Sequence, residues 1–330
     1  MKHGGDLTEA IERHGGAPDN WLDLSTGINP WPWPIPARLP VGAWQRLPSR
    51  ADEDALIAAA RKAYAMPDAA DVAAAAGTQM LIQWLPYLAA PGQVAVVGPT
   101  YGEHVVAWTK AGREVIAVTG LGEVPESAVH IVVVNPNNPD GRITDRTALI
   151  RAAARLKDRG GWLVLDEAFA DVDPDISAVA MCGDLPVVIL RSFGKFYGLA
   201  GLRLGFAIGA PDAIRRIAAA LGPWPCSGPA LHIGTAALRD QRWADRTRSV
   251  LTEEAGKLDK VLVKGGFTIV GGTSLFRLVR HPDALKLHGA LARQHIWCRS
   301  FDRADDLLRF GLPPGDAGRD RLAAALALGR

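Results

Sequence analysis

A lysine on a glycine-rich loop is the side chain in this sequence best suited to covalent chemistry. Lys195 lies in the run Arg191-Ser-Phe-Gly-Lys-Phe-Tyr-Gly-Leu-Ala-Gly-Leu-Arg-Leu-Gly205, three residues after Ser192 and eight before Arg203. A lysine amine can form a Schiff base with an aldehyde, while a hydroxyl and a guanidinium hold a phosphate beside it. A solvated loop with two ordinary basic residues fits the run equally well, so other parts of the chain must decide.

Polar side chains follow three other apolar runs. Asp166 directly follows Trp162-Leu-Val-Leu165, where a buried carboxylate needs a cationic partner such as a protonated pyridine nitrogen or an arginine. Asn135-Pro-Asn-Asn-Pro-Asp-Gly141 is a dense turn, and its three asparagines favour a polar contact. Tyr101 could either stack on a flat ring or pack in the core, and its type alone does not choose.

A candidate phosphate site begins at Gly77-Thr78-Gln79, which precedes an apolar helical stretch starting at Met80. Backbone N–H groups at such a helix start bind phosphate well, although a plain helix start is the commoner explanation of these three residues. Glu167 could ligate a metal, but no pair of histidines with ligand spacing lies near it in the sequence. We therefore expect no metal site.

The elements that must position these side chains follow an alternating pattern. Short runs rich in β-branched residues predict buried parallel strands at 94–97, 131–134, 162–165 and 187–190, and alanine-rich segments predict helices at 52–64 and 144–157. This alternation predicts an α/β fold with a mostly parallel central sheet. Ligands of such sheets bind at the carboxyl ends of the strands, which is where the candidate side chains occur.

The two ends of the chain have different patterns. About the first 40 residues contain Trp31-Pro-Trp-Pro-Ile-Pro36 and predict an extended arm. After residue 215 the sequence predicts a long helix from Gly228 to about Leu262, strands at 267–270, 275–279 and 307–310, and helices at 283–294 and from Asp316. We expect an N-terminal arm over 1–44 that contributes to the active site, a large domain over 45–215 and a small α+β C-terminal domain over 216–330.

The composition argues against several classes of function. The chain has 330 residues, 48% of them apolar, and its 37 basic and 35 acidic residues give a net charge of +2. This balance gives no support to binding of nucleic acid or of an anionic membrane surface. Three widely spaced cysteines suggest neither a disulfide framework nor a zinc cluster, and the start lacks the apolar stretch of a signal peptide. We therefore expect a cytoplasmic protein that binds neither nucleic acid nor membranes.

The order glycine-threonine, tyrosine, asparagine-proline, aspartate, serine-x-x-lysine and arginine resembles the fold-type I pyridoxal phosphate enzymes of the aspartate aminotransferase superfamily. The resemblance covers nearly the whole chain. It implies the fold-type I PLP-dependent transferase fold, the cofactor pyridoxal 5'-phosphate bound by the large domain, and a homodimer. Within the superfamily the chain is similar to histidinol-phosphate aminotransferases and, more closely, to the family of L-threonine O-3-phosphate decarboxylases of cobalamin biosynthesis. The closer similarity rests on His3-Gly-Gly-Asp6, Trp21-Leu-Asp-Leu-Ser-Thr-Gly-Ile-Asn-Pro30, Asp166-Glu-Ala-Phe169, Pro223-Trp224 and Cys298-Arg-Ser300.

The resemblance implies a role for each candidate residue. Lys195 would bind the cofactor covalently, Asp166 would pair with its pyridine nitrogen, and Tyr101 would stack on its ring; these three are the expected catalytic residues. Asn138 would hydrogen-bond the phenolic oxygen of the cofactor. Its phosphate would be held by Gly77, Thr78, Gln79, Ser192 and Arg203. A phosphorylated amino acid substrate would be bound by His3, Gly27, Asn29, Arg299 and Arg309, the last at the position that normally holds the α-carboxylate.

Three positions depart from the usual superfamily pattern. Phe169 replaces a tyrosine that normally gives a second hydrogen bond to the phenolic oxygen, a change that the decarboxylase resemblance tolerates. Leu47 replaces a tyrosine that normally reaches the cofactor phosphate of the partner subunit. Asp140 replaces the threonine of Asn-Pro-Thr-Gly, which is a minor difference.

The implied function is PLP-dependent decarboxylation of L-threonine O-3-phosphate to (R)-1-amino-2-propanol O-2-phosphate, the reaction of a carboxy-lyase. An aminotransferase of the histidinol-phosphate type would use the same lysine and aspartate, but Phe169, Leu47 and the His-Gly-Gly start weigh against it. A cofactor-binding regulatory module would need an added DNA-binding domain, for which we see no N-terminal segment or basic patch. A nicotinamide dehydrogenase does not fit, because no G-x-G-x-x-G follows a predicted strand.

Overall fold

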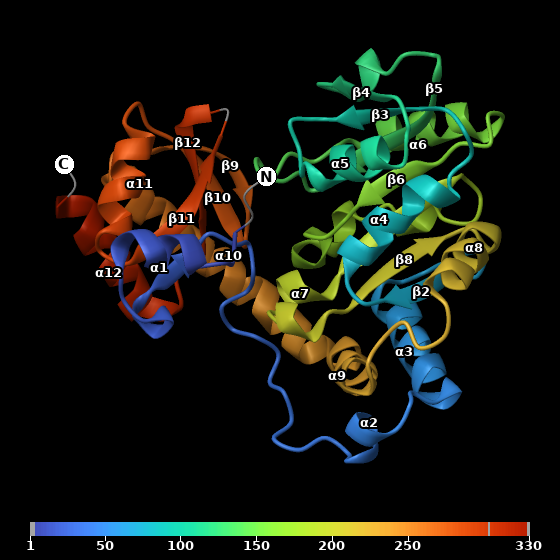
Figure 1. The fold of residues 1–330 in the computed structure, drawn as a ribbon, viewed down its shortest axis with the longest axis horizontal. Helices are drawn as coiled ribbons and strands as arrows, with labels where there is room; N and C mark the ends of the chain where they lie inside the picture. The colour runs from blue at the N-terminus through green and yellow to red at the C-terminus, as the bar shows by residue number, and fades with distance from the viewer. Residues whose placement is uncertain (1–3, 303, 329–330) are drawn as a thin grey trace. The chain divides into compact units, whose positions relative to one another are not determined.

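The chain divides into two compact units, each built around its own sheet (Figure 1). The computed structural model describes residues 4–302 and 304–328. Unit 1 comprises Met1–Pro32, Pro139–Arg142 and Asp245–Arg330, and unit 2 comprises Trp33–Asn138 and Ile143–Ala244. The four residues that follow Asn138 therefore belong to unit 1, although the strands on either side of them in sequence belong to unit 2.

The sheet of unit 2 has seven strands in the order β2-β8-β7-β6-β5-β3-β4. Neighbouring strands are parallel except at β8, which is antiparallel to both β2 and β7. The prediction of a mostly parallel central sheet is confirmed, and the four predicted strands coincide with β3, β5, β6 and β7. The bounds are β2 (Asp71–Ala75), β3 (Gln93–Val97), β4 (Val115–Val118), β5 (Ala128–Val134), β6 (Leu163–Asp166), β7 (Val187–Ser192) and β8 (Gly205–Gly209).

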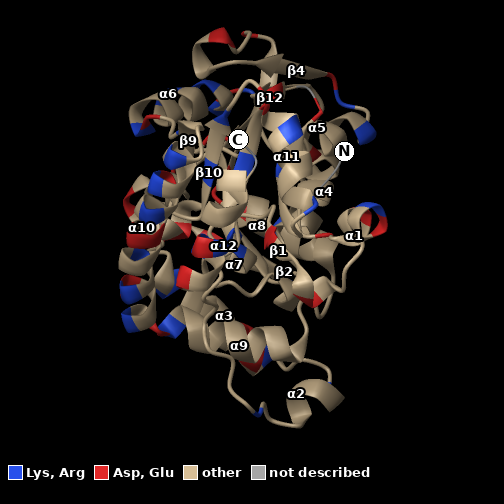
Figure 2. Cartoon of the chain, turned by 90° about the vertical axis from the view of Figure 1, so that its left-hand side faces the viewer, with Lys and Arg blue, Asp and Glu red and all other residues tan. Residues whose placement is uncertain are grey.

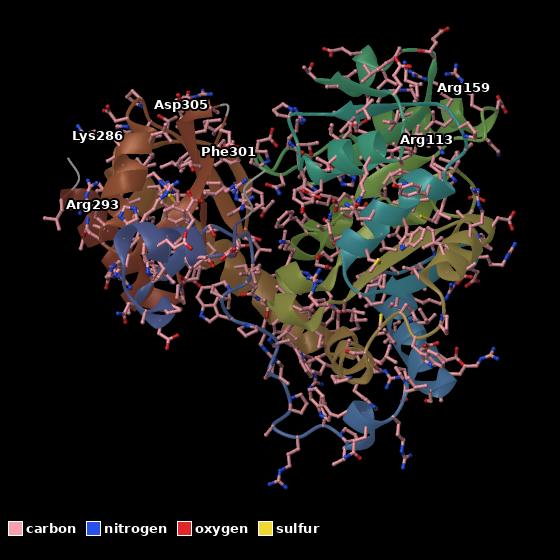
Figure 3. The ribbon with its side chains drawn as sticks, viewed as in Figure 1. Arg113, Arg159, Lys286, Arg293, Phe301 and Asp305 are labelled. Carbon is pink, nitrogen blue, oxygen red and sulfur yellow. The ribbon has the colours of Figure 1, made fainter. Side chains whose placement is uncertain are left out.

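Helices of unit 2 pack against this sheet and hold its edge in place. Leu81 of α4, Trp108 of α5 and Ile214 of α8 share one hydrophobic cluster with strand residues such as Val132. Arg113, just after α5, donates hydrogen bonds to backbone carbonyls at the C-terminal end of α4 and so satisfies that helix end (Figure 3). The helices are α2 (Gly42–Gln45), α3 (Arg50–Ala63), α4 (Thr78–Leu88), α5 (Glu103–Lys110), α6 (Arg146–Lys157), α7 (Phe193–Phe196), α8 (Pro211–Leu221) and α9 (Gly228–Arg239). Short 3-10 turns are η2 (Leu121–Glu123), η3 (Ala170–Val172), η4 (Pro174–Ile176), η5 (Val179–Met181) and η6 (Ala200–Leu202).

The predicted single helix from Gly228 to Leu262 is wrong, because the structure has two helices, α9 and α10 (Gln241–Lys264). Asp240 separates them. Its Oδ1 accepts a hydrogen bond from the backbone N–H of Trp243, and its Oδ2 accepts one from Nε1 of Trp33. An aspartate that caps the first turn of a new helix ends the preceding one. Acidic and basic residues are mixed along α10 (Figure 2), in line with the small net charge of the chain.

Unit 1 contains a five-stranded sheet in the order β1-β11-β12-β10-β9. β1 is parallel to β11, and the other neighbours are antiparallel. Its elements are α1 (Thr8–His14), η1 (Pro18–Asn20), β1 (Leu22–Leu24), β9 (Thr268–Thr273), β10 (Phe276–Arg280), α11 (Ala284–Ala292), β11 (Ile296–Phe301), β12 (Ala304–Gly311) and α12 (Gly315–Leu328). None of the helices in the described parts of the chain combines the length and hydropathy that a membrane crossing requires.

The prediction of an extended arm over about the first 40 residues is wrong for part of that segment. α1, η1 and β1 lie within it, and β1 pairs with β11, with Leu22 opposite Ile296 and Leu24 opposite Cys298. Leu22 and Leu24 are buried, whereas Asp23 between them is partly exposed. The strand depends on a partner more than 270 residues away, which is why local sequence does not reveal it.

Candidate active site

Three strand ends meet at one edge of the unit 2 sheet. Gly205, at the start of β8, pairs with Ala75 at the end of β2 on one side and with Ser192 at the end of β7 on the other. The helix α4 begins at Thr78 with Gly77 as its N-cap, shortly after β2 ends. The structure therefore brings the candidate residues Gly77, Thr78 and Ser192 to the same edge, separated by a single strand.

Two glycines permit close packing at this edge. Gly77 has a φ of +87°, and a Cβ built on it would lie 2.7 Å from Nη2 of Arg203. A Cβ on Gly205 would lie 2.6 Å from the backbone nitrogen of Thr78. Any larger residue would displace the guanidinium or fill the space beside the start of α4. The edge thus offers backbone N–H groups, the hydroxyl of Ser192 and a guanidinium, which is a set of donors suited to a phosphate.

Asp166 is held at the end of β6 by two hydrogen bonds. Its Oδ2 lies 2.9 Å from Nε2 of His104, and its Oδ1 accepts the backbone N–H of Ala168 at 3.0 Å. Asp166 and His104 are both buried. His104 is not among the site residues predicted from the sequence. Its place three residues after Tyr101, near the start of a helix, is the signal that could have found it.

Tyr101 and Gln79 form a second polar group beside this pair. The hydroxyl of Tyr101 lies 3.3 Å from Oε1 of Gln79, and Nε2 of Gln79 donates to Oε2 of Glu103 at 2.9 Å. The ring of Tyr101 stands edge-on to that of His104, with centroids 6.2 Å apart. Gln79 therefore contributes its side chain as well as its backbone, and it fixes the ring that follows β3.

The three asparagines after β5 differ in what their amides do. Oδ1 of Asn135 accepts the backbone N–H of Thr144, and Asn137 bonds to the hydroxyl of Thr100 and the carbonyl of Pro99. Asn135 and Asn137 are buried, so their amides shape the turn. Asn138 is partly exposed, which leaves it accessible to a ligand.

Lys195 lies on the short helix α7, directly after β7. Its Nζ is 5.6 Å from the centroid of the Phe169 ring, which is buried. The side chain of Lys195 is partly buried. The lysine, Asp166, Asn138 and Tyr101 follow four neighbouring parallel strands, β7, β6, β5 and β3, so all four lie at the carboxyl edge of one sheet.

Two arginines lie side by side in unit 1. Arg299 of β11 is directly opposite Arg309 of β12 in an antiparallel pair, so their side chains share one face. Arg309 is buried and donates from Nη2 to the carbonyl of Ser25 at 2.7 Å. Burial, together with the charge of Arg299, lowers the pKa of Arg309 to about 10, against the opposing effect of Asp23. A like-charged pair of this kind favours an anionic ligand.

The segment after β1 adjoins Arg309. Asp23 accepts hydrogen bonds from both the backbone N–H and the hydroxyl of Ser25. Gly27 and Asn29 follow and are buried, and Oδ1 of Asn29 accepts the backbone N–H of Trp31. These candidates and the arginines belong to unit 1, whereas the cofactor candidates belong to unit 2. His3 lies outside the described residues.

Comparison with known proteins identifies the family. The family model described as aminotransferase class I and II matches residues 51–326. The chain belongs to this family. A threonine-phosphate decarboxylase from Sinorhizobium sp is 45% identical over 98% of this chain and 97% of the relative, and one from Pseudomonas aeruginosa is 43% identical over 99% and 97%. A histidinol-phosphate aminotransferase from Aliivibrio fischeri is 30% identical over 58% of this chain and 60% of the relative.

Solved structures have the same fold. The histidinol-phosphate aminotransferase from Sinorhizobium meliloti, in complex with pyridoxal-5'-phosphate, superimposes with a TM-score of 0.83 at 20% identity and covers 98% of this chain and 94% of its own. The predicted superfamily and the predicted fold-type I architecture are therefore confirmed. Within the described residues, no group of three or more His, Cys, Asp and Glu side chains is arranged to hold a metal ion.

Proposed function

We propose that this chain is a pyridoxal 5'-phosphate-dependent decarboxylase that converts L-threonine O-3-phosphate to (R)-1-amino-2-propanol O-2-phosphate in cobalamin biosynthesis. The observation that carries the proposal is the match to threonine-phosphate decarboxylases over nearly the full length of both chains. Histidinol-phosphate aminotransferases match over a much shorter stretch and at lower identity. The paired arginines of unit 1 add a structural reason, since a phosphorylated amino acid carries two anionic groups.

The unit 2 edge fits the cofactor. Because Gly77 and Gly205 have no Cβ, the Arg203 guanidinium and the start of α4 lie close to their backbones, and these groups are donors suited to a phosphate. When bound, the cofactor supplies a ring that accepts the electrons of the bond broken at the substrate Cα. The residues proposed to hold it are Gly77, Thr78, Gln79, Tyr101, Asn138, Asp166, Ser192, Lys195 and Arg203.

Asp166 is proposed to keep a ring nitrogen protonated. Its two oxygens already accept hydrogen bonds from His104 and Ala168, and each carboxylate oxygen has a lone pair left for another donor. His104 thus orients the carboxylate without occupying all of its acceptor capacity. Asn138 is proposed to donate to the phenolic oxygen, a bond that Phe169 cannot supplement because it lacks a hydroxyl.

Lys195 is proposed to bind the cofactor and then to move a proton. After the substrate amine has displaced it, the Lys195 amine takes up a proton. Once the carboxylate has left as carbon dioxide, this protonated amine donates its proton to the substrate Cα as general acid. The Nζ atom lies 5.6 Å from the centroid of the buried, apolar Phe169 ring, and the side chain of Lys195 is partly buried. Lys195 is therefore proposed to hold the cofactor before the substrate binds and to donate the proton in the last step of the reaction.

The substrate anions are proposed to bind in unit 1. A dianionic phosphate offsets the repulsion between Arg299 and Arg309 and holds the substrate in one orientation, which decides the bond that breaks. His3, Gly27 and Asn29 are proposed to complete this anion site. We propose that residues 45–215 hold the cofactor. The arm 1–44 and the domain 216–330 are proposed to hold the substrate.

The deciding experiment supplies the purified protein with L-threonine O-3-phosphate. We expect stoichiometric release of carbon dioxide and aminopropanol phosphate. A keto product with conversion of the cofactor to its amine form, and no carbon dioxide, would establish an aminotransferase instead. Histidinol phosphate with 2-oxoglutarate is the matched control for that outcome.

We also propose that the enzyme is a homodimer of the cytoplasm. Val41, Trp44 and Leu47 are each at least 65% exposed, and large apolar side chains displayed this way favour a protein interface. The three cysteines are all buried and free, which fits a reducing compartment. Light scattering during size-exclusion chromatography tests the dimer, and a fully active monomer would contradict it.

A further inference from the structure

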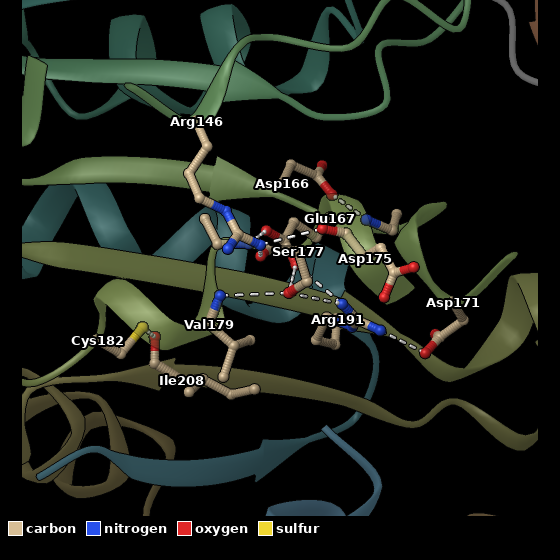
Figure 4. A network of polar contacts seen from close by, with 12 residues as sticks. Arg146, Asp166, Glu167, Asp171, Asp175, Ser177, Val179, Cys182, Arg191 and Ile208 are labelled. Carbon is tan, nitrogen blue, oxygen red and sulfur yellow. Dashed lines mark hydrogen bonds and ion pairs between the residues drawn. The ribbon is translucent and has the colours of Figure 1, made fainter. Parts of the chain in front are cut away.

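A buried ionic cluster adjoins the candidate cofactor residues in sequence (Figure 4). Arg191 donates from Nη1 to Oε2 of Glu167 at 2.9 Å and from Nη2 to Oδ1 of Asp171. The hydroxyl of Ser177 donates to the same Oε2 at 2.6 Å, and the ring centroid of Tyr64 lies 4.5 Å from Cζ of Arg191. Arg191 and Asp171 are each 3% exposed and Glu167 is 0% exposed, so three charged side chains are removed from water together.

Stability alone is a weak explanation for this cluster. Burial by itself would lower the pKa of Arg191, but the carboxylates of Asp171 and Glu167 outweigh it and raise the pKa above its usual value. Well-packed apolar residues often give as much stability as a buried ion pair, whereas a directional ion pair fixes geometry. The cluster is therefore better explained by what it holds in place.

The cluster extends the connection between two neighbouring strands beyond their backbone pairing. The register of β6 and β7 ends at Asp166 opposite Leu190, and the backbone N–H of Glu167 bonds to the carbonyl of Leu190 at 2.9 Å. Glu167 and Arg191 are the next residues after Asp166 and Leu190, and their side chains form the ion pair. The backbone N–H of Ala178 also donates to Oε1 of Glu167 at 2.7 Å, which fixes the carboxylate from the other side.

Each member of this ion pair is the sequence neighbour of a candidate cofactor residue. Glu167 follows Asp166, and Arg191 precedes Ser192. Successive side chains of a strand point to opposite faces, so Ser192 points away from the side that Arg191 occupies. Asp166 likewise bonds to His104 of α5 and not to the cluster. The cluster can therefore act on the cofactor residues through the backbone without touching the cofactor.

We propose that the Glu167–Arg191 ion pair is a positioning device that fixes the separation between Asp166 and Ser192. The inference rests on the proposed function, in which Asp166 holds the ring nitrogen and Ser192 the phosphate of one rigid molecule. A shift of one strand end against the other weakens both contacts together, because the two anchors bind opposite ends of the same cofactor. Glu167 and Arg191 are thus positioning residues.

The test measures cofactor affinity in Arg191→Lys, which keeps the positive charge and loses the two-pronged geometry. Pyridoxal phosphate is added to the full-length apoprotein, and its dissociation constant is read from the absorbance band of the bound cofactor. We expect the constant to rise about tenfold or more, as for other supporting residues, and the pH titration of that band to shift. The control is Arg277→Lys, whose guanidinium bonds Asp259 through Nε and Nη2 in unit 1 and should leave the constant unchanged.

Thermal unfolding of the Arg191→Lys and Arg277→Lys apoproteins is measured alongside. It shows whether weaker cofactor binding comes with a general loss of stability. Where Arg191→Lys does not fold, Ser177→Ala takes its place. It leaves the ion pair intact and removes the hydroxyl that bonds Glu167, Arg191 and the backbone N–H of Val179. It should raise the dissociation constant by a smaller factor. An unchanged constant in folded Arg191→Lys, or in Ser177→Ala where that variant stands in, would overturn the inference. Wild-type protein that binds no pyridoxal phosphate would overturn the proposed function instead.

Discussion

The buried charges of the two units are balanced in opposite ways. In unit 2, Arg191 is matched by Glu167 and Asp171 within hydrogen-bond distance. In unit 1, Arg309 is buried opposite another arginine, Arg299, and its pKa falls to about 10. In the first arrangement two carboxylates already match the positive charge, whereas in the second a like charge lies beside the buried arginine, which favours an anionic ligand. This difference is in line with the proposal that unit 2 holds the cofactor and unit 1 the anionic groups of the substrate.

Replacing the lysine of unit 2 should have the largest effect. We expect Lys195→Ala to lower kcat by about 10⁴-fold, because both the covalent attachment and the proton donor are lost. Decarboxylation assays measure the loss, and Lys110→Ala, on the exposed side of α5, is the control. Borohydride reduction should attach the cofactor to the wild-type protein and not to Lys195→Ala. An adduct on another lysine would show that unit 2 does not hold the resident group where we place it.

The arginine of unit 1 should affect substrate binding and leave the cofactor alone. Arg309→Lys keeps the charge but not the paired donors, so we expect KM to rise about 10- to 100-fold, the range for hydrogen bonds to charged groups. Cofactor affinity should stay at the wild-type value. Arg280→Lys, at an exposed ion pair with Asp306, is the matched control. Weaker cofactor binding with an unchanged KM for the substrate would contradict the proposal that unit 1 binds the substrate and unit 2 the cofactor.

The comparison also shows which features the sequence can reveal. The four β-branched strands and the loop of Lys195 are local signals, and the structure has the strands where the sequence predicts them. β2 and β8, rich in alanine and glycine, carry little strand propensity, so the place of β8 beside β7 and that of β2 beside β8 depend on tertiary pairing. The strand signal therefore locates most of the strand ends that carry the candidate site, but not the antiparallel strand β8, which lies between the ends of β2 and β7.

Contacts between distant residues are the part that the sequence does not reveal. Residue types alone predict that Asp166 needs a partner, yet they give no reason to expect the hydrogen bond with His104, which is 62 residues away. The partner of Glu167 is 24 residues away and lies next to Ser192. Charge pairs of this kind form only after the strands are aligned, so residue types predict the need for a partner but not its identity.

Replacing Arg299 of unit 1 should stabilise the folded protein and weaken its binding of the substrate. Arg299→Met relieves the repulsion beside Arg309, and we expect the free energy of unfolding to rise by about 1 kcal/mol. KM should rise at the same time, because the anion loses a donor. Urea denaturation of the ligand-free protein measures the first effect. A loss of stability would show that the repulsion between the two arginines does not outweigh the other contacts of Arg299.

His130 of unit 2 illustrates a third way to bury a titratable group, as a neutral ring with both nitrogens bonded. Its Nδ1 accepts the backbone N–H of Trp162, and its Nε2 lies 2.9 Å from the carbonyl of Ala90. Burial, with the charge of Arg113, lowers the pKa of His130 below 6.5, although the bond to Ala90 opposes this. The unfolded chain therefore binds a proton at a higher pH than the folded chain does.

The free energy of unfolding should fall as the pH drops below about 6.5 and continue to fall until the folded-state pKa of His130 is passed. His130→Gln keeps a donor and an acceptor but does not titrate, so its stability should depend less on pH over that window. Urea denaturation at pH 7.5 and pH 5 measures the difference, with His232→Gln, a more exposed histidine on α9, as control. An equal pH dependence in wild type and His130→Gln would mean that this ring accepts a proton in the folded state, and that unit 2 tolerates an unmatched charge after all.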